Sequence, residues 1–166
     1  HIFEEGDFFG QTLFSKEQKH IFRAQALETA ELGIMHTDEL ESILCQNYSL
    51  ACEYVEWQER VRMTTVSKMR DLFMYGKTGA LCSVLIRLAN TYGVEHPHGI
   101  RIPLKFTNVE LADYIGCARE SVSRIISQLK KNGAVSIENG GILIRDMDYL
   151  KNVCHCDDCP KEICRI

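Results

Sequence analysis

Apolar and polar residues follow different periods along the chain. Between residues 24 and 34, apolar residues alternate with polar residues or glycine, apart from Glu28, and this two-residue period predicts a half-buried strand. Residues 37–45 are expected to form a short helix with Thr37 as its N-cap. Residues 49–75 contain neither proline nor glycine, so one long helix is predicted there. The chain therefore combines a β-like beginning with helices.

One face of the long helix has the spacing of a helix that pairs with another helix. Positions 50, 54, 57, 61, 64, 68, 71 and 75 alternate steps of four and three residues, as in a coiled-coil seam. The first four are Leu50, Tyr54, Trp57 and Val61. Because these are apolar or aromatic, this half of the helix is predicted to pair with another subunit. The alternative interpretation is that the seam ends near Val61 and that Lys68 pairs with Asp71 at the surface.

The second half of the chain shows the pattern of a helix–turn–helix. A leucine-rich helix is predicted from about residue 81 to Tyr92, after a break at 76–79, and residues 96–99 are predicted to form a loop. Residues 107–110 form a capping box that opens a helix, and the next helix is predicted over 119–131. Its inward face is apolar and consists of Val122, Ile125, Ile126 and Leu129.

The outward face of this last helix carries polar side chains that suit the edges of DNA bases. Arginine can donate two hydrogen bonds to guanine, glutamate can accept one from cytosine, and serine can do either. Such residues have to lie in the N-terminal half of a recognition helix to reach the major groove. The predicted DNA-binding residues are Arg119, Glu120, Ser123 and Arg124.

A β-hairpin is predicted directly after the recognition helix. Residues 135–137 and 142–144 are short apolar runs that flank an Asn-Gly turn at Asn139 and Gly140. Helix, turn, helix and wing in this order favour a winged DNA-binding domain over a helical core segment with an ordinary charged face.

Composition narrows the class of protein. The chain has 166 residues, of which 45% are hydrophobic and 25% charged, and this is typical of globular proteins. No run of about 18 apolar residues exists, and the start lacks a signal peptide pattern and an initiator Met, so a portion of a longer, non-membrane protein is expected. The net charge of −4 implies that DNA binding depends on a few placed side chains rather than on a basic surface.

The cysteines fall into two groups. Cys45, Cys52, Cys82 and Cys117 stand singly and are predicted to be small buried hydrophobic residues. The others are Cys154, Cys156, Cys159 and Cys164, which crowd into one short tail. Thiolates at such spacing select zinc, copper(I) or an iron–sulfur cluster. Structural zinc, with Cys154 or His155 as a fourth ligand, and a redox-active thiol tail both remain open.

Three motifs carry a resemblance to a known family. They are Glu110-Leu111-Ala112, Ile115-Gly116, and Arg119-Glu120-Ser121-Val122-Ser123-Arg124. They resemble the helix–turn–helix signature of the Crp/Fnr regulators, and the resemblance extends back through the long helix to the turn at residues 6–10. It implies a cytoplasmic DNA-binding transcription regulator that is not an enzyme.

The resemblance also implies an α+β fold in four parts. Residues 1–47 would be a partial β-roll sensor domain, similar to cyclic-nucleotide-binding domains but without their earlier strands. Residues 48–76 would be the dimerisation helix, 77–150 a winged helix–turn–helix domain and 151–166 the cysteine-rich tail. The expected partners are a second copy of the chain, two-fold symmetric double-stranded DNA and RNA polymerase.

The sensor region departs from relatives that bind cyclic AMP. Those members have a Glu after the second glycine of the roll motif and a downstream Arg-Ser pair for the phosphate. Here Gln11 follows Gly10, and residues 15–26 contain no Arg-Ser pair. Because an anionic phosphate would lack its bidentate guanidinium partner, no cyclic nucleotide is expected as a ligand.

The tail resembles that of the Bacillus-type branch of Fnr regulators. This branch carries a C-terminal Cys-x2-Cys-x4-Cys motif and takes a fourth ligand from the aspartate of an Arg-Asp-Leu segment. The matching positions here are Cys156, Cys159 and Cys164, with Asp71 in Arg70-Asp71-Leu72. The resemblance implies one four-iron four-sulfur (4Fe-4S) cluster per chain, held by these four residues, and oxygen sensing that controls anaerobic genes. Cys154 has no counterpart in the three-cysteine motif.

Overall fold

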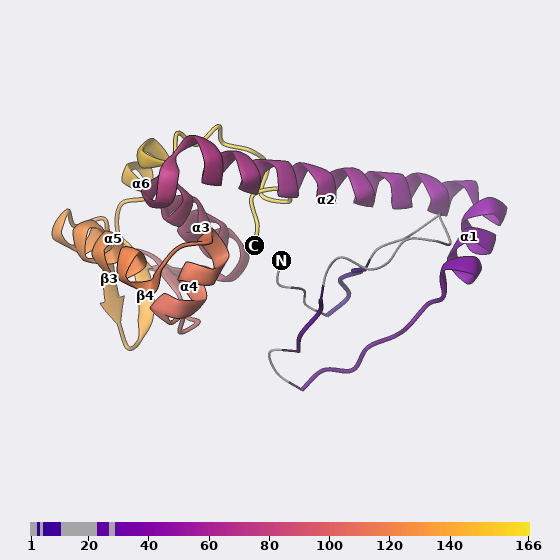
Figure 1. Cartoon of the computed structure of the whole chain (residues 1–166), viewed down its shortest axis with the longest axis horizontal. Helices are drawn as coiled ribbons and strands as arrows, with labels where there is room; N and C mark the ends of the chain where they lie inside the picture. Colours follow the sequence, from indigo (N-terminus) through magenta and orange to yellow (C-terminus); the bar gives the residue numbers. More distant parts are fainter. Residues whose placement is uncertain (1–2, 4, 11–22, 27–28) are drawn as a thin grey trace. The chain divides into compact units, whose positions relative to one another are not determined.

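The computed structural model describes residues 3, 5–10, 23–26 and 29–166 (Figure 1). It forms two compact units, His1–Gln58 and Glu59–Ile166. Gln11 and most of residues 15–26, on which the prediction of no cyclic nucleotide ligand rests, lie outside the described residues. The helices are α1 (Thr37–Gln46), α2 (Tyr48–Met74), α3 (Gly76–Tyr92), α4 (Asn108–Ile115), α5 (Arg119–Lys131) and α6 (Met147–Val153). The strands are β1 (Val94–His96), β2 (Gly99–Ile102), β3 (Val135–Glu138) and β4 (Gly141–Ile144).

The first unit contains α1 and the beginning of α2. Helix α1 starts one residue earlier than predicted, because His36 is the N-cap and its backbone N–H donates to Glu39 at 3.3 Å. The strand predicted over 24–34 is not formed in the described parts of that range. A strand needs a paired neighbour for stability, and alternation alone does not provide one.

The second unit is built around α3 and a four-stranded antiparallel sheet. The strand order is β1-β2-β4-β3. The loop predicted at 96–99 is the tight turn between β1 and β2, with His96 paired to Gly99. Gly99 has φ of +137°, and a Cβ there would lie 1.9 Å from the carbonyl oxygen of Ile144. Glycine is therefore required where β2 approaches the end of β4.

Helix α3 forms the centre of the second unit. It begins at Gly76, so the predicted break is confined to Tyr75, which acts as the N-cap. Residues 79–89 of this helix are all buried, and they contact α4, α5, α6 and β2. Such all-round burial is typical of a core helix. It includes one charged side chain, Arg87, which is 2% exposed.

Part of the predicted seam of α2 is covered by its own chain, whereas Leu50 at its start is exposed. In the first unit, Phe8 packs edge-on against Trp57 at 4.8 Å and lies 6.5 Å from the Tyr54 ring. In the second unit, Thr64 and Asp71 are 6% and 5% exposed, so Asp71 does not form a surface ion pair. The exposed apolar residues of this part of α2 include Val66, Met69 and Phe73, which lie on another face.

Within the residues that the structure describes, no helix is long and apolar enough to cross a membrane.

Candidate functional site

The helix–turn–helix forms where the sequence predicts it. The Thr107 hydroxyl accepts a hydrogen bond from the Glu110 backbone at 3.2 Å, and the Glu110 carboxylate accepts one from the Thr107 backbone at 2.7 Å. These reciprocal bonds satisfy backbone donors at the start of α4 and lower the pKa of Glu110. Gly116 ends α4 with φ of +61°, a left-handed conformation that glycine adopts without strain.

Helix α5 separates an inward apolar face from an outward polar face. All four residues of the predicted inward face are buried. The predicted DNA-binding residues Arg119, Glu120, Ser123 and Arg124 are all exposed. They occupy the first two turns of α5, the part of a recognition helix that faces base edges. The structure therefore brings these four side chains together on one accessible surface.

The predicted wing is a two-residue hairpin. Glu138 pairs with Gly141 across the turn, and Asn139 and Gly140 have φ of +52° and +79°. Positive φ at both central residues matches the right-handed twist of the flanking strands. The Ser136 hydroxyl donates to Glu138 at 3.1 Å and Arg145 donates to Glu138 at 3.1 Å, and these two hydrogen bonds lower the pKa of Glu138. The wing is thus fixed beside α5.

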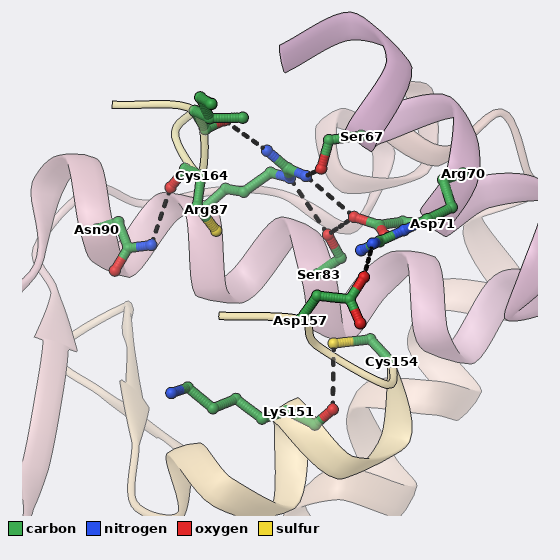
Figure 2. A network of polar contacts seen from close by, with 11 residues as sticks. Ser67, Arg70, Asp71, Ser83, Arg87, Asn90, Lys151, Cys154, Asp157 and Cys164 are labelled. Atoms are coloured by element: carbon green, nitrogen blue, oxygen red, sulfur yellow. Dashed lines mark hydrogen bonds and ion pairs between the residues drawn. The ribbon is translucent and has the colours of Figure 1, made fainter. Parts of the chain in front are cut away.

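The cysteine-rich tail returns from α6 to α2 and α3 (Figure 2). The His155 ring stacks on Tyr75 at 5.0 Å between centroids, and Asp157 forms an ion pair with Arg70. Further along the tail, Asn90 of α3 donates to the Cys164 carbonyl at 2.8 Å. These contacts bring the predicted tail ligands to the end of α2, although some 80 residues separate the two segments.

Asp71 is the buried centre of the polar contacts in Figure 2. Its Oδ1 accepts hydrogen bonds from Arg70 Nε at 3.1 Å and Nη2 at 2.8 Å. Its Oδ2 accepts from Arg87 Nη2 at 3.0 Å and from the Ser83 hydroxyl. Two cations and a hydroxyl therefore supply hydrogen bonds to both oxygens of the buried carboxylate. A metal bond to either oxygen has to share that oxygen with one of these donors.

Asp71 and the four tail cysteines line one small cavity. Arg70, Ser83, Ile86 and Arg87 complete its walls. Cys154 and Cys164 are 3% and 6% exposed, and Cys156 and Cys159 are half-buried. Burial raises the pKa of Cys154 to about 12 and of Cys164 to about 11, with Arg87 opposing the rise at Cys164. These two thiols are protonated at neutral pH, and a metal would have to displace their protons.

The donor set fits an iron–sulfur cluster in its chemistry. Thiolates are the usual ligands of such clusters, and a carboxylate is a harder ligand that exchanges more readily. In the described part of the chain, no three His, Cys, Asp or Glu side chains converge closely enough to hold a single metal ion. A cluster of several irons is bound by ligands that surround it, so the shared cavity is the relevant observation.

Three of the four isolated cysteines are less buried than the sequence analysis predicted. Cys82 of α3 is fully buried, as predicted, and burial with the neighbouring Cys154 raises its pKa to about 12. Cys45 is exposed, and Cys52 and Cys117 are half-buried, so the prediction is wrong for these three. They lie on helix faces or in a turn at the surface, where the sequence gives a cysteine no distinguishing pattern.

Comparison with known proteins supports the helix–turn–helix domain. A model of the Crp-like helix-turn-helix domain matches residues 79–153, which include α4, α5 and the wing. The anaerobic regulatory protein of Bacillus subtilis is 42% identical over 99% of this chain and 70% of its own length. The chain belongs to the Crp/Fnr family. It is a DNA-binding transcription regulator and not an enzyme.

Other Crp/Fnr relatives match over shorter shares of their length. The listeriolysin regulatory protein of Listeria monocytogenes is 32% identical over 75% of this chain and 53% of its own. A mutant of CooA from Carboxydothermus hydrogenoformans superposes with a TM-score of 0.62 at 21% identity, over 70% of this chain and 54% of CooA. The chain thus spans about half the length of these two proteins, and the CooA likeness shows the α+β fold with its winged helix–turn–helix.

The residues that sequence analysis missed are those that hold Asp71 and the tail in place. They are Ser67, Arg70, Ser83, Arg87, Asn90 and Asp157. One signal was available, because Arg87 stands in the middle of a leucine-rich helix. An arginine surrounded by apolar residues needs a buried partner.

Proposed function

We propose that this chain is an oxygen-sensing regulator of anaerobic gene expression, and that Cys156, Cys159, Cys164 and Asp71 hold its 4Fe-4S cluster. The observation that carries the proposal is the cavity that these four side chains line together. The similarity to the anaerobic regulatory protein of Bacillus subtilis supports it. When bound, a cluster supplies oxygen-reactive iron and bonds that tie the tail to α2.

The tail is well placed to control the DNA-binding domain. It begins where α6 ends, and α6 follows the wing directly in the chain. Its far end contacts Arg87 and Asn90 on α3, and Asp157 pairs with Arg70 on α2. A tail fixed at this position constrains α5 relative to the end of α2. A released tail removes that constraint, and the orientation of the recognition helices then varies.

We also propose that the active form is a homodimer paired through α2. Helix–turn–helix dimers place two recognition helices in successive major grooves of a two-fold symmetric site. The exposed Val66, Met69 and Phe73 follow steps of three and four residues, which is the spacing of a helix-pairing stripe. This stripe replaces the seam that begins at Leu50 as the proposed dimer contact.

At the DNA, Glu120 and Arg124 are proposed as the main base contacts. Arg119 would contact a base or a phosphate, and Ser123 would help to choose between related half-sites. All four are exposed at the start of α5. Cyclic nucleotide binding is not part of the proposal, because Gln11 and the absence of an Arg-Ser pair leave a phosphate without its partner.

One observation favours a second candidate, a regulator with a structural zinc tail. Cys154 lines the same cavity as the three proposed thiol ligands, and four thiolates are a common ligand set for structural zinc. In that case the tail would hold the fold together and sense nothing.

The test is to purify the protein without oxygen, record its visible spectrum, assay iron and sulfide, and then admit air. The proposal expects a brown protein with about four irons and four sulfides per chain. It also expects specific DNA affinity to fall as the colour bleaches. A colourless protein with stoichiometric zinc would support the second candidate. Unchanged DNA affinity after bleaching would contradict the sensing role.

A further inference from the structure

Arg87 joins three segments of the second unit through one side chain (Figure 2). Its Nη2 donates to Ser67 Oγ at 2.7 Å and to Asp71 Oδ2 at 3.0 Å, both on α2. Its Nη1 donates to the Ile163 carbonyl of the tail at 3.0 Å, and its Nε donates to Ser83 on α3 at 3.2 Å. Four hydrogen bonds from the guanidinium therefore go to partners on α2, α3 and the tail.

The positions of these partners link Arg87 to both halves of the proposed ligand set. Asp71 is the proposed ligand on α2, and Ile163 directly precedes the proposed ligand Cys164. A buried guanidinium is costly to desolvate, so its donors hold their partners firmly in place. Because the donors of arginine form a rigid planar fork, they also fix the directions of those partners.

We propose that Arg87 is a positioning residue for the iron–sulfur cluster, orienting the Asp71 carboxylate and the main chain beside Cys164 so that the ligands on α2 and on the tail meet. This inference rests on the proposed function and adds to it a residue that is not itself a ligand. Residues that hold metal ligands by hydrogen bonds typically change metal affinity by about 10–100-fold when they are replaced.

Other side chains share parts of this arrangement. Arg70 also contacts Asp71 and, through Asp157, the tail, but it is 31% exposed and its ion pairs are screened by solvent. Asn90 lies about one turn further along α3 and, within the described residues, donates to the Cys164 carbonyl of the tail at 2.8 Å and also contacts the Cys164 side chain. Asn90 therefore offers a matched comparison, because it anchors the tail without contacting Asp71.

The experiment compares the full chain with its Arg87→Lys and Asn90→Ala variants after anaerobic reconstitution with iron and sulfide. The readouts are iron and sulfide per chain, the rate at which an iron(II) chelator removes iron, and the thermal unfolding midpoint of the same samples. Lysine keeps the charge but lacks the planar fork. We expect iron release from Arg87→Lys to be about tenfold faster or more, and iron release from Asn90→Ala to be accelerated clearly less, because Asn90 holds Cys164 but not Asp71.

Several outcomes would overturn the inference. If a folded Arg87→Lys variant released iron at the rate of the unsubstituted chain, the planar guanidinium of Arg87 would have no role in positioning the cluster ligands. An equal acceleration in Asn90→Ala would show that only tail anchoring matters. If Arg87→Lys does not fold, Ser67→Ala removes one Arg87 partner without leaving a buried charge, and unchanged iron release in that variant would also overturn the inference. An unsubstituted chain that takes up no iron or sulfide would contradict the proposed function itself.

Discussion

The DNA-reading segment and the tail junction lie in the same compact unit but are built from different kinds of contact. Residues 107–145 are organised by neighbours in sequence, through the Thr107–Glu110 capping box, the turn at Gly116 and the two-residue wing turn. The tail junction joins residues 67–90 to residues 154–166 through buried polar groups. Local contacts make a rigid surface, whereas long-range polar contacts make a junction that depends on every partner.

This difference has a consequence for regulation. A recognition helix has to keep its shape whether or not it is bound to DNA, and local capping with apolar packing provides that. A switch needs a segment that is fixed under one condition and released or moved under another. The tail is attached by polar contacts to Arg70, Arg87 and Asn90 as well as by its buried Cys164 and Ile166, and the members of such a polar network depend on one another.

The largest effect is expected at the centre of the tail junction. Asp71→Asn leaves the buried Arg87 without its counter-charge, and the free energy of unfolding should fall by about 3–5 kcal/mol. Chemical denaturation of the reduced protein measures it. The control is Asp157→Asn, which removes an exposed partner of Arg70 and should cost less than about 1 kcal/mol. Equal losses in the two variants would remove the distinction between buried and exposed partners.

The next effect separates DNA recognition from stability. Replacing Glu120 or Arg124 with Ala should weaken binding to the specific site by about 1–3 kcal/mol and relax specificity at one position in each half-site. Stability should hardly change, because both side chains are exposed. Titration against specific and random DNA measures this, with Gln128→Ala as the control on the later part of α5. Equal losses on both DNAs would refute direct contact with bases.

A smaller effect is expected at the start of α4. Thr107→Ala removes the hydroxyl that accepts from the Glu110 backbone, and the unfolding free energy should fall by about 1 kcal/mol. Thr107→Ser keeps the hydroxyl and should stay near the parent value. Anaerobic iron retention should be the same in both variants, because the capping box lies outside the tail junction. A faster loss of iron from Thr107→Ala would show that the two regions are coupled.

The smallest effect concerns alkaline pH. The pKa of Cys82 is raised to about 12 in the folded chain from an ordinary value of 9.0. The folded state therefore keeps this proton where the unfolded state loses it, so stability is complete below pH 9 and falls as the pH rises toward 12. Denaturation of the reduced protein at pH 7.5 and 9.5 should show a loss from this group of less than about 1 kcal/mol. The Cys82→Ala variant should lose less between the two pH values, and an equal loss would exclude Cys82 as the cause.

Sequence alone predicted the helix–turn–helix and its wing. The capping box, the glycine turn, the apolar spacing of α5 and the Asn-Gly turn each act over a few residues. The four proposed DNA-binding residues at the start of α5 were named from that pattern, and all four are exposed. The tail cysteines were found by their crowding and Asp71 by family resemblance. Neither observation from the sequence predicted a shared cavity with Arg70, Ser83 and Arg87 in its walls.

The tertiary structure decided which face of α2 is buried and which is free. The four-three spacing predicted pairing through Leu50, Tyr54, Trp57 and Val61, and Leu50 is exposed. Further along the same stripe Thr64 and Asp71 are covered within the chain, whereas Val66, Met69 and Phe73 are exposed on another face. It also decided that Arg87 is the interior partner of Asp71. Spacing along a helix states which residues share a face, but only the packing of distant segments determines what that face contacts, because burial depends on neighbours far away in the sequence.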